Sequence, residues 1–217
     1  MMKHLICTIL ILSCAFCWPG VADAKKKVVD IYDLTLDENL QTPEIKNDKV
    51  DNRIKAFQLE VALAFKKAGT EVELMRDEEV IVLTFSASEL FNSNDTVLTD
   101  VGKKLIRPIT RFLNPPGLYK VLLVMHSDNT GSDKYQFALT SSRVNAVFDW
   151  IDANASTDFV VPYALGGSDP IWDNNSMAHR KLNRRLEVYL IPDEAMIELA
   201  KKGKLDMRTF KTNKKTK

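Results

Sequence analysis

The feature that most constrains this chain is a short apolar run that ends abruptly in a polar loop. Residues 121–125, Val-Leu-Leu-Val-Met, contain no polar side chain, which predicts a strand buried on both faces of a sheet. Turn-forming residues fill the segment that follows, His126–Ser132. In sheets that pack against helices, ligands tend to bind beyond the carboxyl ends of such strands. We therefore expect a ligand site in this loop.

A helix is expected after the loop. Apolar side chains spaced by three or four residues form one helical face, at Val144, Val147, Phe148 and Ile151. Thr140 is the expected N-cap. It would place Arg143 in the first turn, where unpaired backbone N–H groups favour an anion.

Asp128 in the loop and Arg143 at the expected helix start form a pair of opposite charges. Such a pair matches a zwitterion, whose ammonium would bind Asp128 and whose carboxylate would bind Arg143. The alternative is structural: Asp128 caps its own turn, and Arg143 pairs with a surface acid. Spacing alone leaves both interpretations open.

Three segments resemble the family of OmpA-like C-terminal domains, which includes porin tails, peptidoglycan-associated lipoproteins and flagellar stator proteins. The segments are His126–Ser132, Tyr135–Arg143 and Asn183–Val188. The usual pattern is G-H-T-D-x-x-G-x-x-x-Y-N-x-x-L-S-x-x-R-A, followed downstream by N-R-R-V-E. The Asp, Gly, Tyr, Leu and Arg of the first part match with the family's spacing. The resemblance extends from about residue 80 to residue 192.

Several positions depart from the family pattern. They are Met125 for Gly, Ser127 for Thr, Gln136 for Asn, Thr140 for Ser, Val144 for Ala, and His179 for a Gly before Arg180. Ser127 and Thr140 keep the hydroxyl group. Gln136 has the largest consequence, because it replaces a shorter amide side chain.

The resemblance implies an α/β fold of the α+β type. Its core would be a βαβαββ mixed sheet of about four or five strands with helices packed on one face. This chain would add a helix and a hairpin strand before that core. The resemblance also implies non-catalytic binding of peptidoglycan through the diaminopimelate residue of the stem peptide, whose side chain ends in an ammonium and a carboxylate.

The residues that the resemblance assigns to the ligand site are Phe91, Asn92, Asp128, Thr130, Arg143 and Arg184. Phe91 and Asn92 would form one wall of the ligand groove, although Phe91 equally fits a core position beneath a turn. Neighbouring residues of a strand face opposite sides, so only one of Arg184 and Arg185 should face the groove. We favour Arg184.

The N-terminus has the layout of a secretory signal peptide, with Lys3, a short apolar run, and Ala-Asp-Ala before a lysine cluster that begins at Lys25. All the cysteines, Cys7, Cys14 and Cys17, lie in it, so a mature chain that begins at Lys25 would have no thiol. A competing lipoprotein cleavage box ends at Cys14, where acylation would anchor the protein.

The expected organisation is a signal peptide at 1–24, an extended leader at 25–49, an N-terminal helix and edge strand at 50–78, the OmpA-like domain at 79–192, and a short helix with a basic tail at 193–217.

Composition disfavours two classes of function. The formal net charge is +1 and no basic patch is interleaved with aromatics, so nucleic-acid binding is not expected. The mature chain would contain only His126 and His179, without zinc-ligand spacing, and no nucleophile is paired with a base. We expect no enzyme, no metal and no cofactor.

The expected partners are peptidoglycan and proteins of the outer membrane or envelope. The expected location is the periplasm or, if Cys14 is acylated, the outer membrane. A protein-interaction scaffold without wall binding remains an alternative, and a peptidoglycan hydrolase is less favoured.

Overall fold

The computed structural model describes residues 30–210. The expected signal peptide, Cys14 and the start at Lys25 lie outside the described residues, as does most of the basic tail. The elements are η1 (Ile31–Asp33), α1 (Leu36–Asn39), α2 (Asp48–Lys67), β1 (Glu71–Met75), β2 (Val80–Ser86), α3 (Ala87–Leu90), α4 (Asp100–Ile106), η2 (Arg107–Phe112), β3 (Tyr119–His126), α5 (Asp133–Asp152), β4 (Val160–Gly166), α6 (Met177–Asn183), β5 (Arg185–Pro192), α7 (Glu194–Lys201) and η3 (Met207–Phe210).

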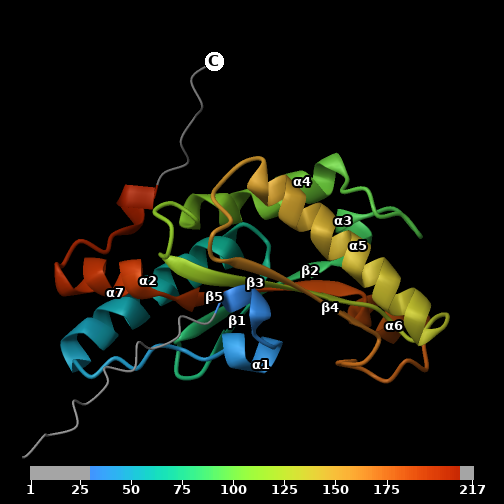
Figure 1. Cartoon of the computed structure of the whole chain (residues 1–217), viewed down its shortest axis with the longest axis horizontal. Coiled ribbons are helices and arrows are strands. Elements are labelled where there is room, and N and C mark those ends of the chain that lie inside the picture. The colour runs from blue at the N-terminus through green and yellow to red at the C-terminus, as the bar shows by residue number, and fades with distance from the viewer. Residues whose placement is uncertain (1–29, 211–217) are drawn as a thin grey trace, which may run out of the picture.

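One five-stranded sheet forms the centre of the molecule, in the order β1-β2-β5-β3-β4 (Figure 1). β3 pairs in parallel with β4 and antiparallel with β5, and the remaining pairs are antiparallel. All side chains from Val121 to Met125 are fully buried. The predictions of a mixed sheet and of a strand buried on both faces are therefore confirmed.

The long helices α2 and α5 pack on the same face of the sheet, together with α4, η2 and α7, and form the main core. α2 buries the stripe that its helical period predicts, including Ile54, Phe57, Val61 and Phe65. Gln58 lies on the same stripe and accepts a hydrogen bond of 2.5 Å from the hydroxyl of Tyr119 on β3. The extra helix is thus joined to the sheet by apolar packing and by a buried polar contact.

The prediction of an extended leader is wrong for its described part, because residues 30–40 form η1 and α1 and cover the opposite face of the sheet. Ile31, Leu36 and Leu40 pack against a second cluster of buried side chains, which are Val80, Val82, Leu122, Val124, Val161 and Ile191. Thr35 and Glu38 form a capping box that starts α1. A sheet with apolar side chains on both faces needs a cover on both, and this segment supplies the second one.

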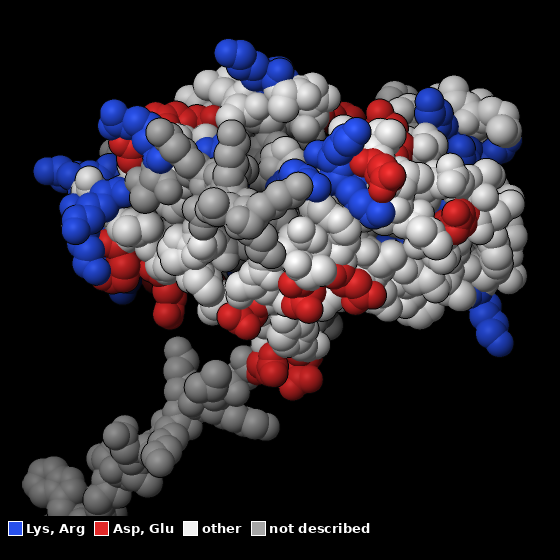
Figure 2. Space-filling model, turned by 90° about the horizontal axis from the view of Figure 1, so that it is seen from above, with Lys and Arg blue, Asp and Glu red and all other residues white. Residues whose placement is uncertain are grey.

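The charged surface agrees with the near-zero net charge. On the face shown in Figure 2, basic and acidic side chains of the described residues are interspersed, so this face has no continuous basic surface. Within residues 30–210, no helix combines the length and apolar character needed to cross a membrane.

Candidate functional site

A pocket of about 790 Å³ opens beside the loop that follows β3. All six residues that the sequence assigned to a site line it: Phe91, Asn92, Asp128, Thr130, Arg143 and Arg184. They come from the segment between α3 and α4, from the β3–α5 loop, from α5, and from the residue just before β5. The fold thus brings four separate stretches of the chain to one concave surface.

Asp128 is a buried carboxylate at this pocket, 4% exposed. One carboxylate oxygen accepts a hydrogen bond of 2.9 Å from the backbone N–H of Thr130, and the other forms an ion pair with the guanidinium of Arg184. Burial disfavours the charged form, but the contacts with Thr130 and Arg184 outweigh it and lower the pKa of Asp128. Asp128 therefore caps its own turn and also presents a negative charge to the pocket.

The expected position of Arg143 in the first helical turn is wrong. α5 begins at Asp133, and its N-cap is Ser132, whose hydroxyl accepts a hydrogen bond from the N–H of Tyr135. Thr140 lies inside the helix, where its hydroxyl donates to the carbonyl of Gln136 at 2.9 Å. Arg143 is the eleventh residue of α5. It lies too far from the helix N-terminus for the unpaired N–H groups there to help it bind an anion.

Arg143 is instead held by the segment that follows α3. Its Nε donates to the carbonyl of Asp95 at 2.8 Å, and its Nη2 donates to the carbonyl of Asn92 at 3.3 Å. The guanidinium carbon lies 5.0 Å from the ring centroid of Phe91. The side chain is 6% exposed and makes no ion pair among residues 30–210. Two of its five N–H groups are therefore used, and its positive charge remains available to a ligand.

The two interpretations of Phe91 both hold in part. Its side chain is 2% exposed and belongs to the main core. Its ring also supports Arg143 through a cation–π contact. Asn92 is exposed, and its carbonyl rather than its side chain contacts Arg143.

Gln136 and Thr140, two departures from the family pattern, join α5 to the residues that end β4. The side-chain amide of Gln136 donates to the carbonyl of Gly131 at 3.1 Å and accepts from the N–H of Gly167 at 3.1 Å. The hydroxyl of Thr140 accepts from the N–H of Gly166 at 3.1 Å. These contacts hold the loop that carries Asp128 against the β4–α6 loop.

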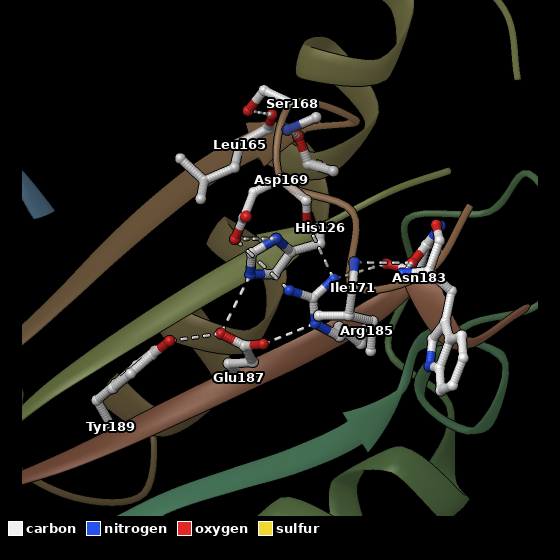
Figure 3. A network of polar contacts seen from close by, with 12 residues as sticks. His126, Leu165, Ser168, Asp169, Ile171, Asn183, Arg185, Glu187 and Tyr189 are labelled. Carbon is white, nitrogen blue, oxygen red and sulfur yellow. Dashed lines mark hydrogen bonds and ion pairs between the residues drawn. The ribbon is translucent and has the colours of Figure 1, made fainter. Parts of the chain in front are cut away.

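A network of charged and polar side chains lies next to the pocket residues, on the other side of β5 (Figure 3). Arg185, 2% exposed, contacts Glu187 at 2.6 Å. His126 is also buried, with its ring nitrogens 3.4 Å from Glu187 and 3.8 Å from Asp169. Burial opposes the charge of Glu187, but contacts with His126, Tyr189 and Arg185 outweigh it and lower its pKa to about 2. Arg184 lines the pocket whereas Arg185 does not, as strand alternation predicts.

Sequence reasoning missed one charged residue of the pocket, Arg180 on α6. No helix was expected here, whereas the structure has α6, capped by Ser176. The signal in the sequence was Ser176, a favoured N-cap residue, followed by Met177, a good helix former. Among the described residues, no group of three or more His, Cys, Asp or Glu side chains is arranged to hold a metal ion.

Comparisons with known proteins give relatives that are named as lipoproteins, two of them only provisionally, while no family model matches the chain. The lipoprotein YiaD of Escherichia coli K12 is 25% identical over 134 residues, which is 61% of each chain. The outer-membrane lipoprotein YfiB of Pseudomonas aeruginosa is 32% identical over 50% of this chain and 65% of its own length. The lipoprotein YfiB of E. coli K12 is 30% identical over 50% of this chain and 69% of its own length. The chain therefore matches less than two thirds of the length of YiaD and of the P. aeruginosa protein.

Solved structures with the same fold include a MotB-like protein of Desulfovibrio vulgaris, with a TM-score of 0.57 and 18% identity over 67% of this chain and 97% of that one. The cell wall anchor of the type VI secretion system of P. aeruginosa has a TM-score of 0.52 and 24% identity, over 64% of this chain and 97% of that one. At these identities the likeness concerns the fold. It confirms the predicted fold class.

Proposed function

This chain belongs to the family of OmpA-like domains, and on that basis we propose that it is a non-catalytic module that binds cell-wall peptidoglycan through the diaminopimelate residue of the stem peptide. Relatives named as lipoproteins, one of them of the outer membrane, support a place in the cell envelope. The module would tether the envelope to the wall or serve as a scaffold there.

The observation that carries the proposal is the pocket that holds a buried carboxylate and a buried guanidinium together. The lowered pKa of Asp128 keeps its carboxylate charged at neutral pH, so it suits a ligand ammonium. Arg143 has N–H groups left over after binding two carbonyls, so it suits a ligand carboxylate. A diaminopimelate side chain carries one ammonium and one carboxylate, and therefore matches both groups.

The contacts at the pocket favour binding over catalysis. The hydroxyl of Ser127 donates to the carbonyl of Asp128 at 2.7 Å instead of to a base. The ring of His126 lies beside Glu187 and Asp169, and His126 is not among the residues that line the pocket. Neither side chain is thus arranged as an activated nucleophile or its base.

Co-sedimentation with purified peptidoglycan tests the proposal. Asp128→Ala and Arg143→Ala should each weaken binding by roughly 2 to 5 kcal/mol, because each leaves a buried charge without its partner. The double variant should lose less than the sum, since both groups serve one ligand. Asp133→Ala and Lys134→Ala are matched controls, because these exposed α5 residues do not line the pocket.

Each variant must first give the wild-type circular dichroism spectrum. If both single pocket variants still bind peptidoglycan as the wild type does, the diaminopimelate proposal is wrong and the protein-interaction scaffold takes its place. Release of soluble wall fragments by the wild type would instead indicate a hydrolase.

Export is part of the same proposal. Intact-mass measurement of the protein recovered from the envelope should give a chain that begins at Lys25. A mass that corresponds to a chain beginning at an acylated Cys14 would make the protein a lipoprotein anchored in the membrane.

A further inference from the structure

The pocket contains more positive charge than a single diaminopimelate head group requires. Three guanidinium groups line it, those of Arg143, Arg180 and Arg184, against the single carboxylate of Asp128. Arg184 is paired with Asp128. The head group assigned above would neutralise Arg143 with its carboxylate and would share Asp128 with its ammonium. Arg180 then has no counterion.

Arg180 is positioned for a ligand. Its Nη1 donates to the carbonyl of Asn174 at 2.7 Å, and its Nη2 contacts the sulfur of Met177 at 3.2 Å. These contacts hold the guanidinium in place and use two of its five N–H groups. Within the part of the chain that the structure describes, Arg180 forms no ion pair with a carboxylate. A partly buried guanidinium that lines a pocket and forms no ion pair with a protein acid suits an anionic group of the ligand.

We propose that Arg180 binds a second carboxylate of the stem peptide, so that the pocket selects stem peptides with free carboxylates over amidated ones. The inference rests on the function proposed above. A stem tripeptide has two carboxylates besides the one on the diaminopimelate side chain: the α-carboxylate of the preceding γ-linked glutamate and the C-terminal carboxylate of diaminopimelate. Both present the same chemistry to Arg180, and amidation of either removes the charge.

Binding of three synthetic stem tripeptides, measured by isothermal titration calorimetry at low salt, tests the inference. One peptide has all its carboxylates free, one is amidated at the glutamate α-carboxylate, and one is amidated at the C-terminus. The wild type should bind the free peptide roughly tenfold more tightly than one of the amidated peptides, because a charge-assisted hydrogen bond is lost. The peptide that loses affinity identifies the carboxylate that Arg180 binds.

Variants assign the selectivity to one side chain. Arg180→Gln should bind the free peptide and that amidated peptide equally, and Arg180→Lys should keep part of the preference because it keeps the charge. Lys181→Gln removes one positive charge from the next residue of α6, which is exposed and does not line the pocket, so it should select as the wild type does. Thermal unfolding checks that each variant is folded.

The outcomes separate the two proposals. If the wild type binds all three peptides equally, the role of Arg180 is wrong while wall binding stands. The same conclusion follows if Arg180→Gln keeps the preference, or if Lys181→Gln loses it. If the wild type binds no peptide, the proposed function fails, and the inference fails with it.

Discussion

Arg184 and Asp128 form an ion pair that joins the residue before β5 to the loop after β3. The side chain of Asp128 is 6% exposed and that of Arg184 is 31% exposed, so the pair is open to solvent on the side of the arginine. In the proposed function, a ligand ammonium would share Asp128 with a guanidinium that is already present. The pair also gives the buried carboxylate a counterion when no ligand is bound.

Arg184→Gln should raise the pKa of Asp128 and destabilise the protein by about 1 to 3 kcal/mol at pH 7. The reason is that a buried carboxylate loses its counterion, while the partial exposure of the pair limits the cost. NMR titration of the Asp128 carboxyl carbon and urea unfolding measure the two effects. Arg180→Gln is the control, because it removes a pocket guanidinium that has no ion pair with Asp128. An unchanged pKa of Asp128 in Arg184→Gln would contradict the role of the pair.

Gly167→Ala should destabilise the protein by about 1 to 3 kcal/mol and weaken peptidoglycan binding. A Cβ atom at Gly167 would lie 2.4 Å from the Gln136 side-chain oxygen and 2.8 Å from the backbone oxygen of Asp128. Gln136 and either the loop that carries Asp128 or the segment of Gly167 must therefore shift. Urea unfolding of Gly167→Ala, Gln136→Ala and the double variant should show a smaller loss in the double variant than the sum. Strict additivity would show that the two residues do not interact.

The sequence predicted the sheet and six of the residues that line the pocket, because these features carry a local signal. The apolar run of β3 is uninterrupted, and the family spacing identifies Asp128, Arg143 and Arg184. The start of α5 lacked such a signal. Its first two turns bury only Gln136, while Tyr135 and Phe137 are exposed, so the apolar period begins only at Val144.

The cover on the second face of the sheet was missed for a similar reason. Its apolar contacts come from Ile31, Leu36 and Leu40. Leu36 and Leu40 have helical spacing, but Ile31 lies five residues before Leu36, and a single pair is too short to establish a period. The buried side chain of Asn39 also holds the segment, through a hydrogen bond to the carbonyl of Ile31 within it and another to the hydroxyl of Tyr163 on β4. A tertiary contact of this kind leaves no periodic pattern.

Asn39→Ala tests this cover. The Asn39 amide donates to the carbonyl of Ile31 at 2.6 Å and to the hydroxyl of Tyr163 at 2.7 Å, and Asn39 is fully buried. Its removal should cost about 1 to 3 kcal/mol, because two partly buried acceptors lose their donor. Amide hydrogen exchange over residues 31–41 should become faster. Asp37→Ala, an exposed change in the same short helix, should leave the exchange rates near those of the wild type. Equal rates in Asn39→Ala would show that the amide does not hold the segment.

Glu187 should make the stability of the protein depend on acid pH. Its pKa is about 2 in the folded chain, against an ordinary value of 4.5. A carboxyl group whose pKa is depressed on folding stabilises the fold fully above its unfolded pKa, and this contribution declines as the pH falls toward the folded pKa. The window therefore runs from about pH 5 down to about pH 2. With a discount for the partial exposure of the group, the contribution is about 2 kcal/mol.

Urea unfolding of the wild type and of Glu187→Gln between pH 7 and pH 2.5 measures this contribution. Glu187→Gln should be less stable than the wild type at pH 7, because Arg185 loses its buried partner. The gap should narrow as the pH falls, since the wild-type carboxyl becomes neutral as well. Glu60→Gln, a change on the exposed side of α2, should follow the wild type in parallel throughout. A gap between Glu187→Gln and the wild type that stays constant down to pH 2.5 would contradict this account. It would show that the pKa of Glu187 is the same in the folded and the unfolded state.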